Sequence, residues 1–466
     1  MRILLLGISP LPWERSRHHG APGLRTWQLC QALLDDDHRV CLVTFGEESA
    51  GEPPPGSRWL RRVRLGPADV LDPGRLERAL RDHEPDAAVA ASSYHCTRAA
   101  ATLGQLAPDL PLWIDLPGDL MAEAQVRAAL ARPGEEVDFV ADYRAVLLPA
   151  LRRGDRFSAV SARQRRALLG QLGLAGRLGA GTLGEELVAV MPVSAEAPDA
   201  GAGIRPPGLP DGGRFVVCSS GSFNSWMDVD TLFEGLERAM TRDSRVCFVA
   251  AGGDVPGHCE APLDRLRRRV DASSQRDRFH LLGWLEPAEL RGLYGRADVA
   301  ANLDLPCLEA ELGSRNRVLD WARHGLACVT TPGTELCAEL ADREAALAVP
   351  FSDPEALARL LCELAGARRP ELEPLGQRAR RLVLQRYAPA RTTAALRRWA
   401  RAPRLAGDAP QRGTPPAADS RDALAEALRL RQQLDAVQGS AAYGVLRRAE
   451  RLAREVRGTI LGKKTG

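Results

Sequence analysis

The feature of this sequence that most constrains its fold is an alternation of short apolar runs with helical patterns, which occurs once in each half of the chain. In the first half, a helical pattern at 24–34 and others like it separate apolar runs at 2–6, 40–45, 87–91, 112–115 and 157–160. In the second half the runs lie at 215–219, 246–251, 279–282, 299–301, 327–330 and 346–349. Strands that alternate with helices pair in parallel and are covered by helices on both faces. The sequence therefore predicts an α/β protein with two doubly wound, Rossmann-like sheets.

Composition shifts divide the chain into two domains and a tail. Of its 466 residues, 45% are hydrophobic, which supplies enough core for two domains of average size. Pro, Gly and Asp are concentrated at 198–213 and at 402–420, as is typical of linkers. We therefore expect a first domain at 1–200, a linker at 201–213, a second domain at 214–402 whose last helix is free to pack back on the first, a linker at 403–420 and an amphipathic helical tail at 421–466.

Net charge and cysteine content limit the partners and the cellular compartment that we expect for this chain. A formal net charge of +3 gives no electrostatic reason to expect a nucleic-acid partner. The ten cysteines show no C-x-x-C and no paired spacing, so a reduced, cytoplasmic chain is the simplest expectation. The start, MRILLLGIS, is followed at once by Trp13, Glu14 and Arg15, which is not the pattern of a signal peptide, and no segment reaches membrane-spanning length.

Lysine occurs only at Lys463 and Lys464, so any cationic clamp inside the folded body must be built from arginine. Arginine suits such a clamp because its planar guanidinium recognises phosphate through two parallel hydrogen bonds.

Two arginines stand where a helix is predicted to begin, in the segment SRNRVLDWARHG. Ser314 is the expected N-cap and Gly325 the expected end of this helix. Cations in a first turn oppose the helix dipole at a cost of roughly 0.3–1 kcal/mol each, so Arg315 and Arg317 indicate a phosphate-bearing ligand. If they form such a clamp, replacing either by alanine should weaken nucleotide-diphosphate binding and leave the fold intact. The alternative is a solvated Arg317–Asp320 pair on an exposed turn.

Five motifs of the second half occur in an order that resembles a known enzyme family. They are GSFNSWMDVDTLFEGL, VAAGGDVPG, HLLGWLEPAELRGLYGRADVAANLDLP, SRNRVLDWARHGLACVTTPGTELCAELA and VPFSDPEALARLL. With SARQRRALLGQLGLAGR of the first half, they resemble the GT-B glycosyltransferases of the family-4 type over residues 1–402. The resemblance implies transfer of a sugar, expected to be a hexosyl group, from a nucleotide diphosphate sugar. It also implies a retained anomeric configuration and no obligatory metal or other cofactor.

The resemblance assigns donor-binding residues around two turns of the second half. The turn with Gly221 and Asn224 takes the place of the family's diphosphate-binding turn, and its backbone N–H groups are expected to face the diphosphate. The family's Arg and Lys are missing from this turn, so the two helix-start arginines take over the clamp. Gly283 and Trp284 stand where the family holds the base, and packing is the alternative role for Trp284.

An acidic pair carries the family's remaining donor contacts. Members of this type have two glutamates eight positions apart, the first on hydroxyls of the donor sugar and the second on the ribose. Asp320 stands at the second position, where a carboxylate suits the cis-diol of ribose. Leu312 occupies the first position, and either of its neighbours Glu309 and Glu311 is a candidate for the sugar. We expect Asp320→Asn to weaken binding of the bare nucleotide diphosphate.

The first half is expected to hold the acceptor. Gly20 and Gly23 resemble the family's flexible glycine pair, which lets the backbone approach the phosphates, and a plain turn is the alternative. His95 follows the run at 87–91 as a catalytic candidate, with a structural role as the alternative. Asp115 and Asp119, in DLPGD, stand at the carboxyl end of a predicted strand. Asp115 is a catalytic candidate and Asp119 an acceptor-binding candidate, or else a helix N-cap.

Other motifs carry less information. Asp228-Val229-Asp230 reads D-x-D, but it falls at a predicted helix start where acids are favoured without a metal, so no metal site is expected. No G-x-G-x-x-G follows the first strand, and neither a Walker pattern nor a G-x-S-x-G elbow occurs. The expected function is transfer of a sugar from a nucleotide sugar to a lipid-linked saccharide acceptor, in bacterial polysaccharide or cell-surface glycan synthesis. The rivals are a nucleotide-sugar epimerase on the same fold and a catalytically degenerate GT-B scaffold or binding protein.

The tail has the pattern of an amphipathic helix, with Leu424, Leu428, Leu434 and Val437 on one side. Over 443–466, seven basic residues stand against two acidic ones, a net charge of +5. A basic amphipathic helix can lie on an anionic membrane surface. The tail therefore predicts peripheral attachment to the inner face of the cell membrane, and the alternative is a solvated or self-associating helix.

Overall fold

The computed structural model describes residues 1–409 apart from 17–19, 47–50, 55–56, 67–68, 70–71, 92–93, 131–137, 200 and 255–259. Residues 410–466 lie outside the described part, and with them lies the predicted tail. The described chain belongs to one contact unit, Met1–Ala409.

Seven parallel strands form the first sheet, in the order β3-β2-β1-β4-β5-β6-β7. Their bounds are β1 Arg2–Ile8, β2 Arg39–Phe45, β3 Leu60–Leu65, β4 Ala87–Ala90, β5 Leu112–Leu116, β6 Arg156–Ala159 and β7 Val188–Val190. The five predicted runs are strands. The two edge strands were not predicted, because β3 reads LRRVRL with arginine at three of its six positions and β7 has only three residues.

Six parallel strands form the second sheet, in the order β10-β9-β8-β11-β12-β13. Their bounds are β8 Phe215–Ser220, β9 Val246–Ala251, β10 Phe279–Gly283, β11 Val299–Asn302, β12 Cys328–Thr330 and β13 Leu347–Ala348. Each coincides with a predicted run to within two residues. The prediction of two doubly wound sheets is confirmed.

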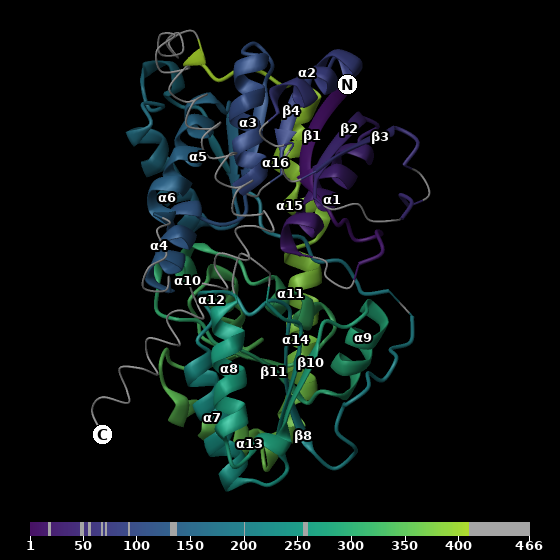
Figure 1. The fold of residues 1–466 in the computed structure, drawn as a ribbon, viewed down its shortest axis with the longest axis vertical. Helices are drawn as coiled ribbons and strands as arrows, with labels where there is room; N and C mark the ends of the chain where they lie inside the picture. The colour runs from purple at the N-terminus through teal and green to yellow at the C-terminus, as the bar shows by residue number, and fades with distance from the viewer. Residues whose placement is uncertain are drawn as a thin grey trace, which may run out of the picture. The chain divides into compact units, whose positions relative to one another are not determined.

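Helices cover both faces of each sheet (Figure 1). Those that follow strands of the first sheet are α1 Ala21–Leu34, α2 Pro73–His83, α3 Tyr94–Leu106, α4 Leu120–Leu130, α5 Phe139–Arg153 and α6 Ala162–Leu174. The later helices are α7 Val229–Arg242, α8 Ala261–Ala272, α9 Pro287–Arg296, α10 Leu308–Leu312, α11 Asn316–Arg323, α12 Glu335–Asp342, α13 Pro354–Ala365, α14 Leu372–Arg386, α15 Pro389–Thr392 and α16 Ala394–Arg401.

The alternation of side chains along a strand explains why each sheet needs two cores. In β1, Leu4 and Leu6 belong to one apolar cluster and Ile3 and Leu5 to another, because successive side chains point to opposite faces. Strand β8 divides its side chains in the same way. Both sheets are therefore buried on both faces, as parallel sheets require.

The last described helices return to the first sheet. Leu396 and Trp399 of α16 join the apolar cluster that holds Ile3 of β1, and the ring of Trp399 lies 5.5 Å from that of Trp113 on β5. Figure 1 shows α15 and α16 beside α1 and β1. The chain thus crosses from the second sheet back to the first before residue 402.

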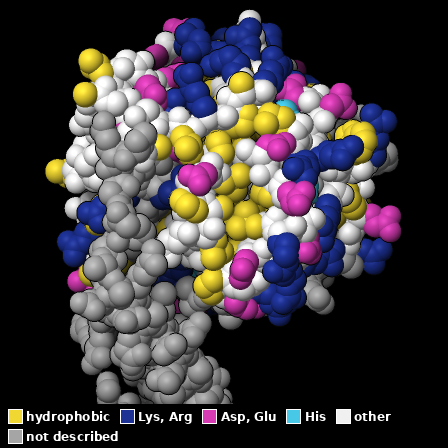
Figure 2. All heavy atoms as spheres, turned by 90° about the horizontal axis from the view of Figure 1, so that it is seen from above, with side chains coloured by type: hydrophobic (Ala, Val, Ile, Leu, Met, Phe, Trp, Pro, Cys, Tyr) yellow, Lys and Arg dark blue, Asp and Glu magenta, His cyan; other side chains and the backbone are white. Residues whose placement is uncertain are grey.

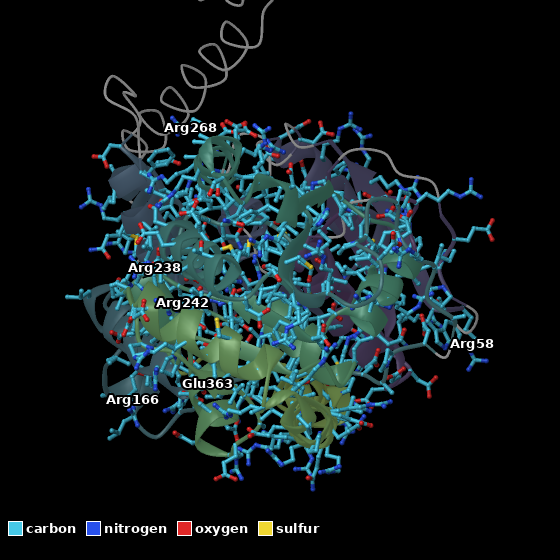
Figure 3. All side chains as sticks on the ribbon, turned by 90° about the horizontal axis from the view of Figure 1, so that it is seen from below. Arg58, Arg166, Arg238, Arg242, Arg268 and Glu363 are labelled. Carbon is cyan, nitrogen blue, oxygen red and sulfur yellow. The ribbon has the colours of Figure 1, made fainter. Side chains whose placement is uncertain are left out.

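Arginine supplies the basic groups of the described surface, since both lysines lie beyond residue 409. Every dark-blue side chain in Figure 2 is therefore an arginine, and acidic and apolar side chains lie between many of them. On the opposite side of the molecule, Arg242 of α7 forms two hydrogen bonds of 2.8 Å with Glu355 of α13 (Figure 3). Among the described residues, no helix has the length and apolar composition needed to cross a membrane.

Candidate functional site

The second sheet reverses its strand order between β8 and β11, and the turns that follow these two strands are joined. The Asp228 N–H donates to the Leu303 carbonyl at 2.9 Å, and the Leu305 N–H donates to the Trp226 carbonyl at 2.8 Å. Ligands of doubly wound folds bind at such a reversal, outside the carboxyl ends of the strands. This edge of the second sheet is therefore the candidate site.

Glycines form the floor of the site at the ends of β8, β9 and β10. Gly221, Gly252 and Gly283 have φ angles of +90°, +124° and +71°, which favour glycine. A Cβ on Gly252 would lie 2.1 Å from the Gly221 carbonyl oxygen, so no side chain fits there. The Gly221 N–H donates to the Ala251 carbonyl at 2.8 Å, and it therefore does not face a ligand as predicted.

Arg317 lies over this floor. Its Nη2 donates to the Ser222 carbonyl and lies 4.0 Å from the position that a Cβ of Gly221 would take. Its Nη1 lies 3.4 Å from the Met227 sulfur. Arg317 thus reaches from α11 to the turn after β8, where the sequence predicted a diphosphate.

The start of α11 differs from the prediction. Its N-cap is Arg315, not Ser314, and no side chain accepts a hydrogen bond from its first turn. The Ser314 hydroxyl donates to the Asn316 side chain instead, at 3.4 Å. The end is as predicted, since Gly325 follows the last turn with a φ of +78°. The uncapped N-terminus adds its partial positive charge to that of Arg317.

Arg315 points inward, which contradicts its predicted part in a ligand clamp. Only 2% of its surface is exposed. Its Nε donates to Asp304 at 2.9 Å, its Nη2 donates to Glu309 at 2.7 Å, and its guanidinium packs over the Trp226 ring at 5.5 Å. Two buried carboxylates neutralise the charge that a ligand was expected to neutralise, so Arg315→Ala is expected to destabilise the fold.

Glu309 is also buried in the interior, which contradicts its predicted contact with the donor sugar. Both of its oxygens accept hydrogen bonds from Arg315. Burial raises the pKa of Glu309 to about 7, against the opposing effect of Arg315. Glu311 lies exposed on the same short helix, α10, and Leu312 is buried. Since α10 lies against α4 and α6, this segment joins the two halves of the described unit.

Asp320 belongs to a network that ties α11 to β8 and α9. The Tyr294 hydroxyl donates to Asp320 at 2.7 Å and lies 2.8 Å from the Ser220 hydroxyl, which also accepts from Trp321 at 2.8 Å. Arg323 donates to the other oxygen of Asp320 at 2.7 Å, so the alternative Arg317–Asp320 pair is replaced by an Arg323–Asp320 pair. The Asp320 side chain remains 26% exposed. It is fixed in position and still reachable.

Trp284 and Asn224 lie at the rim of the glycine floor. The indole nitrogen of Trp284 lies 2.8 Å from the position that a Cβ of Gly253 would take, so the half-buried ring covers the turn after β9. The Asn224 carbonyl accepts from the Met227 N–H at 3.0 Å, within the turn after β8. These residues and Gly283 are therefore brought together with Arg317 by the fold.

In the first sheet, Asp115 is a structural residue. Its carboxylate has no exposed surface and accepts from Arg25 at 2.8 and 2.9 Å and from the Ser158 hydroxyl at 2.6 Å. Arg25 also donates to the Met191 carbonyl at 2.9 Å. The predicted catalytic role is wrong because a substrate cannot reach this carboxylate.

Asp119 is the N-cap of α4. One of its oxygens accepts from the Met121 and Ala122 N–H groups at 3.0 and 2.9 Å, and the other accepts from Gln171 at 2.7 Å. The capping alternative therefore describes Asp119, and its oxygens are not directed at an acceptor.

The remaining residues predicted in the first half are at the starts of α3 and α1. His95 is the second residue of α3, exposed, with its ring 5.6 Å from that of Tyr94. Gly20 is the N-cap of α1 and Gly23 lies inside that helix, where a Cβ would fall 2.1 Å from the Pro10 carbonyl oxygen. Gly23 therefore serves a close contact between helix and loop and is not part of a flexible pair.

The D-x-D acids also have structural partners. Asp228 is the N-cap of α7 and accepts from the Thr231 N–H at 2.9 Å. Asp230 pairs with Arg265 and Arg269 at 3.0 and 2.9 Å. Within the described part of the chain, no group of three His, Cys, Asp or Glu side chains could hold a metal ion.

Three site residues were missed by sequence reasoning. Asp304 comes shortly after the predicted run at 299–301, as Asp115 stands at the end of the run at 112–115, and that position was a usable signal. Ser220 and Tyr294 gave none, because the hydrogen bond between them joins residues 74 positions apart.

Comparisons with known proteins agree with this geometry. The profile described as "Glycosyl transferase 4-like domain" matches residues 20–178, and that described as "Glycosyl transferases group 1" matches residues 214–366. Each profile falls on one of the two sheets, and the second covers the glycine floor and α11. A search of curated proteins finds no significant match.

Solved structures share the fold at low sequence identity. HepE of Anabaena, in complex with UDP and glucose, is 14% identical with a TM-score of 0.60, and the match covers 86% of this chain and 99% of that one. Sucrose-phosphate synthase of Thermosynechococcus elongatus is 16% identical with a TM-score of 0.63, covering 86% and 98%. A UDP-forming trehalose-phosphate synthase of Burkholderia vietnamiensis is 13% identical with a TM-score of 0.61, covering 86% and 99%.

Proposed function

The chain is a glycosyltransferase of the GT-B fold and the family-4 type, and on that premise we propose what it transfers and how. The proposed reaction moves a hexosyl group from a nucleotide diphosphate sugar to a saccharide acceptor with retention of the anomeric configuration. The proposed setting is bacterial polysaccharide or cell-surface glycan synthesis on a lipid-linked acceptor, at the cytoplasmic face of the membrane.

The observation that carries the proposal is the position of Arg317 over the glycine floor. Gly221, Gly252 and Gly283 end three strands there with positive φ angles, and a Cβ on Gly252 would clash with the Gly221 carbonyl oxygen, so the floor carries no side chains of its own. The helices α7, α12 and α13 are each capped by an Asp or Thr side chain, whereas α11 beside Arg317, like α8, α10 and α14, has no side-chain cap. A diphosphate would supply the anion that this helix start lacks.

The same groups account for leaving-group stabilisation. As the glycosidic bond breaks, negative charge grows on the departing diphosphate. Arg317 and the α11 N-terminus are held in place before the reaction, so they can stabilise this charge without reorganising. We propose that the chain needs no obligatory metal, since the positive charge at this position comes from its own residues.

Asp320 is the proposed ribose ligand. Its carboxylate is fixed by Tyr294 and Arg323 and keeps about a quarter of its surface exposed. A carboxylate has about four lone-pair sites, so it can still accept a hydrogen bond from a ribose hydroxyl. Trp284, beside the same floor, is the proposed neighbour of the base.

On the acceptor side, His95 and Glu311 are exposed candidates on α3 and α10. We propose them for acceptor or sugar contact in place of Asp115, Asp119 and Glu309, whose oxygens are committed to the fold.

The test is nucleotide binding by calorimetry, with UDP as the probe because the HepE structures contain UDP or UDP-glucose. Arg317→Ala should weaken binding about ten- to a hundredfold, since a charged hydrogen bond contributes roughly 1.5–3 kcal/mol. Arg343→Ala, which removes an exposed arginine directly after α12, is the matched control and should bind as the parent does. Equal binding by the Arg317 variant and the parent would exclude the proposed diphosphate position.

Turnover separates the rival functions. With UDP-glucose and an acceptor mixture, a transferase releases UDP only when an acceptor is present. An epimerase changes the sugar without an acceptor, and a degenerate binding protein binds UDP with no turnover in either condition.

A further inference from the structure

A short segment after α6 holds three leucines in solvent. Leu174, the last residue of α6, is 92% exposed, Leu183 is 88% exposed and Leu178 is 55% exposed. Among the described large hydrophobic residues, the first two have the highest exposed fractions. Burying a leucine side chain contributes roughly 1.5–3 kcal/mol, so three uncovered leucines within ten residues indicate a surface that something else covers.

The segment that carries the leucines is rigid. Arg177, in its middle, is buried and donates to the Leu151 and Gly154 carbonyls, both at 2.6 Å. The Thr182 hydroxyl donates to the Arg177 carbonyl at 2.9 Å. A Cβ on Gly173 would lie 3.4 Å from Leu178, so Leu178 packs against the end of α6. The leucines therefore project from an ordered backbone and cannot turn inward without breaking the buried bonds of Arg177.

The described chain ends at this segment. Arg177 forms a buried ion pair with Asp408, and the Gly407 N–H donates to Glu185 at 3.1 Å. The chain therefore leaves the described unit beside this segment, and in the sequence the basic residues 443–466, with a net charge of +5, come later than this point. On α6 itself, Arg166 lies on the exposed face with Leu174 and extends outward (Figure 3).

We propose that Leu174, Leu178 and Leu183 form a leucine ridge that enters the headgroup region of an anionic membrane. Apolar side chains beside basic groups are the composition of a surface that lies on such a membrane. Around the leucines, the negative charge of the exposed Glu186 offsets the positive charge of the exposed Arg166. The electrostatic attraction to the membrane therefore comes mainly from the basic C-terminal residues, and the leucines contribute by inserting apolar side chains. The proposal rests on the proposed function only for its lipid-linked acceptor, and the ridge itself has no part in donor binding.

The test uses the full-length chain and sedimentation with vesicles of phosphatidylcholine and phosphatidylglycerol at 7:3. Leu174→Ser combined with Leu183→Ser should weaken vesicle partitioning about ten- to a hundredfold, because two leucines lose their transfer into the headgroup region. The matched control, Ile204→Ser combined with Leu106→Ser, removes two other exposed apolar side chains and should partition as the parent does.

Salt distinguishes the two contributions. At high salt the attraction of the basic residues is screened, and the parent should still bind better than the leucine variant. Equal partitioning of parent and leucine variant at low and high salt would overturn the proposal. So would a parent dimer that dissociates on substitution, seen by analytical ultracentrifugation, because a second copy would then cover the ridge.

UDP binding and thermal unfolding should be unchanged in the leucine variant. These two measurements distinguish a failure of the ridge proposal from a failure of the proposed function. If the proposed function is wrong, the parent itself will not bind UDP.

Discussion

Both sheets place buried arginine and carboxylate groups near the carboxyl ends of their strands, but the two clusters balance charge differently. In the first sheet, Asp115 faces one arginine, Arg25, and its remaining bond comes from a serine hydroxyl. In the second, Arg315 is shared by Asp304 and Glu309, which leaves one carboxylate in excess. Arg317, two residues further along, lies over a backbone floor and donates to the neutral Ser222 carbonyl.

The comparison shows that a charged residue at a strand end is not by itself a sign of function. Asp115 stands in the position where active-site groups of this architecture are found, yet it serves to hold β5, α1 and β6 together. What distinguishes the second sheet is partial exposure at Asp320 and a glycine floor with Arg317 over it. Three predictions test this contrast, in order of expected effect.

The largest effect is expected at the buried Asp115–Arg25 pair of the first sheet. Asp115→Asn removes the charge that neutralises Arg25 and leaves a buried guanidinium uncompensated, so the free energy of unfolding should fall by about 3–5 kcal/mol. Urea denaturation measures this loss. The control Glu84→Gln breaks the exposed Arg2–Glu84 pair and should cost no more than about 1 kcal/mol. A loss at Asp115 no greater than in the control would mean that the first cluster is not structural.

A somewhat smaller and pH-dependent effect is expected at the cluster of Arg315, Asp304 and Glu309 beside the second sheet. Arg315→Met leaves Asp304 and Glu309 buried without a cation, and the loss should approach about 3 kcal/mol at pH 8. The loss should be smaller at pH 6. In the parent, the pKa of Glu309 is raised from 4.5 to about 7, and removing the arginine, which lowers it, raises it further. The folded variant then keeps its Glu309 proton above pH 7 while the unfolded chain has lost it, so the difference in stability grows with pH.

Unfolding curves of parent and Arg315→Met at pH 6 and pH 8 measure this difference. Adding Glu309→Gln to the variant should remove most of its pH dependence. A stability difference that is the same at both pH values would show that Glu309 does not take up a proton in this cluster.

The smallest effect should appear in binding and leave stability almost unchanged. Asp320→Asn removes a charged acceptor from the proposed ribose position, and UDP affinity should fall about tenfold, or roughly 1.5 kcal/mol. Calorimetry with UDP measures it, and Asp342→Asn, an exposed acid on α12, is the control. If Asp320→Asn instead destabilises the fold and binds UDP as the parent does, Asp320 belongs with Asp115 as a structural acid.

Much of the fold could be predicted from the sequence because parallel strands carry a local signal. A strand buried on both faces is a short apolar run in any context, so 11 of the 13 strands coincide with predicted runs. The two that were missed are edge strands, where burial is incomplete and the apolar run is short or interrupted. The family could also be predicted from the order of local motifs, and the two matching profiles confirm that prediction.

The candidate site could be predicted only in part. Gly221, Gly283, Arg317 and Asp320 were identified from motif and position, whereas Gly252 was not, and the fold brings them to one edge of the second sheet. Their proposed ligand contacts remain predictions. The residues that hold them, Tyr294 and Ser220, were beyond local reasoning because their hydrogen bonds join distant segments.

The sequence by itself determined two α/β halves and most of their strands, since these follow from apolar periodicity and turn residues. The order of the strands, with its reversal between β8 and β11, was decided by the tertiary structure. Only the tertiary structure decided which charges are matched. Arg315 and Arg317 are two residues apart at the same helix start, yet one turns into a pocket of two acids and the other lies over a glycine floor. Which groups a charged side chain contacts depends on segments that long-range packing places within hydrogen-bonding distance, and local sequence does not contain that information.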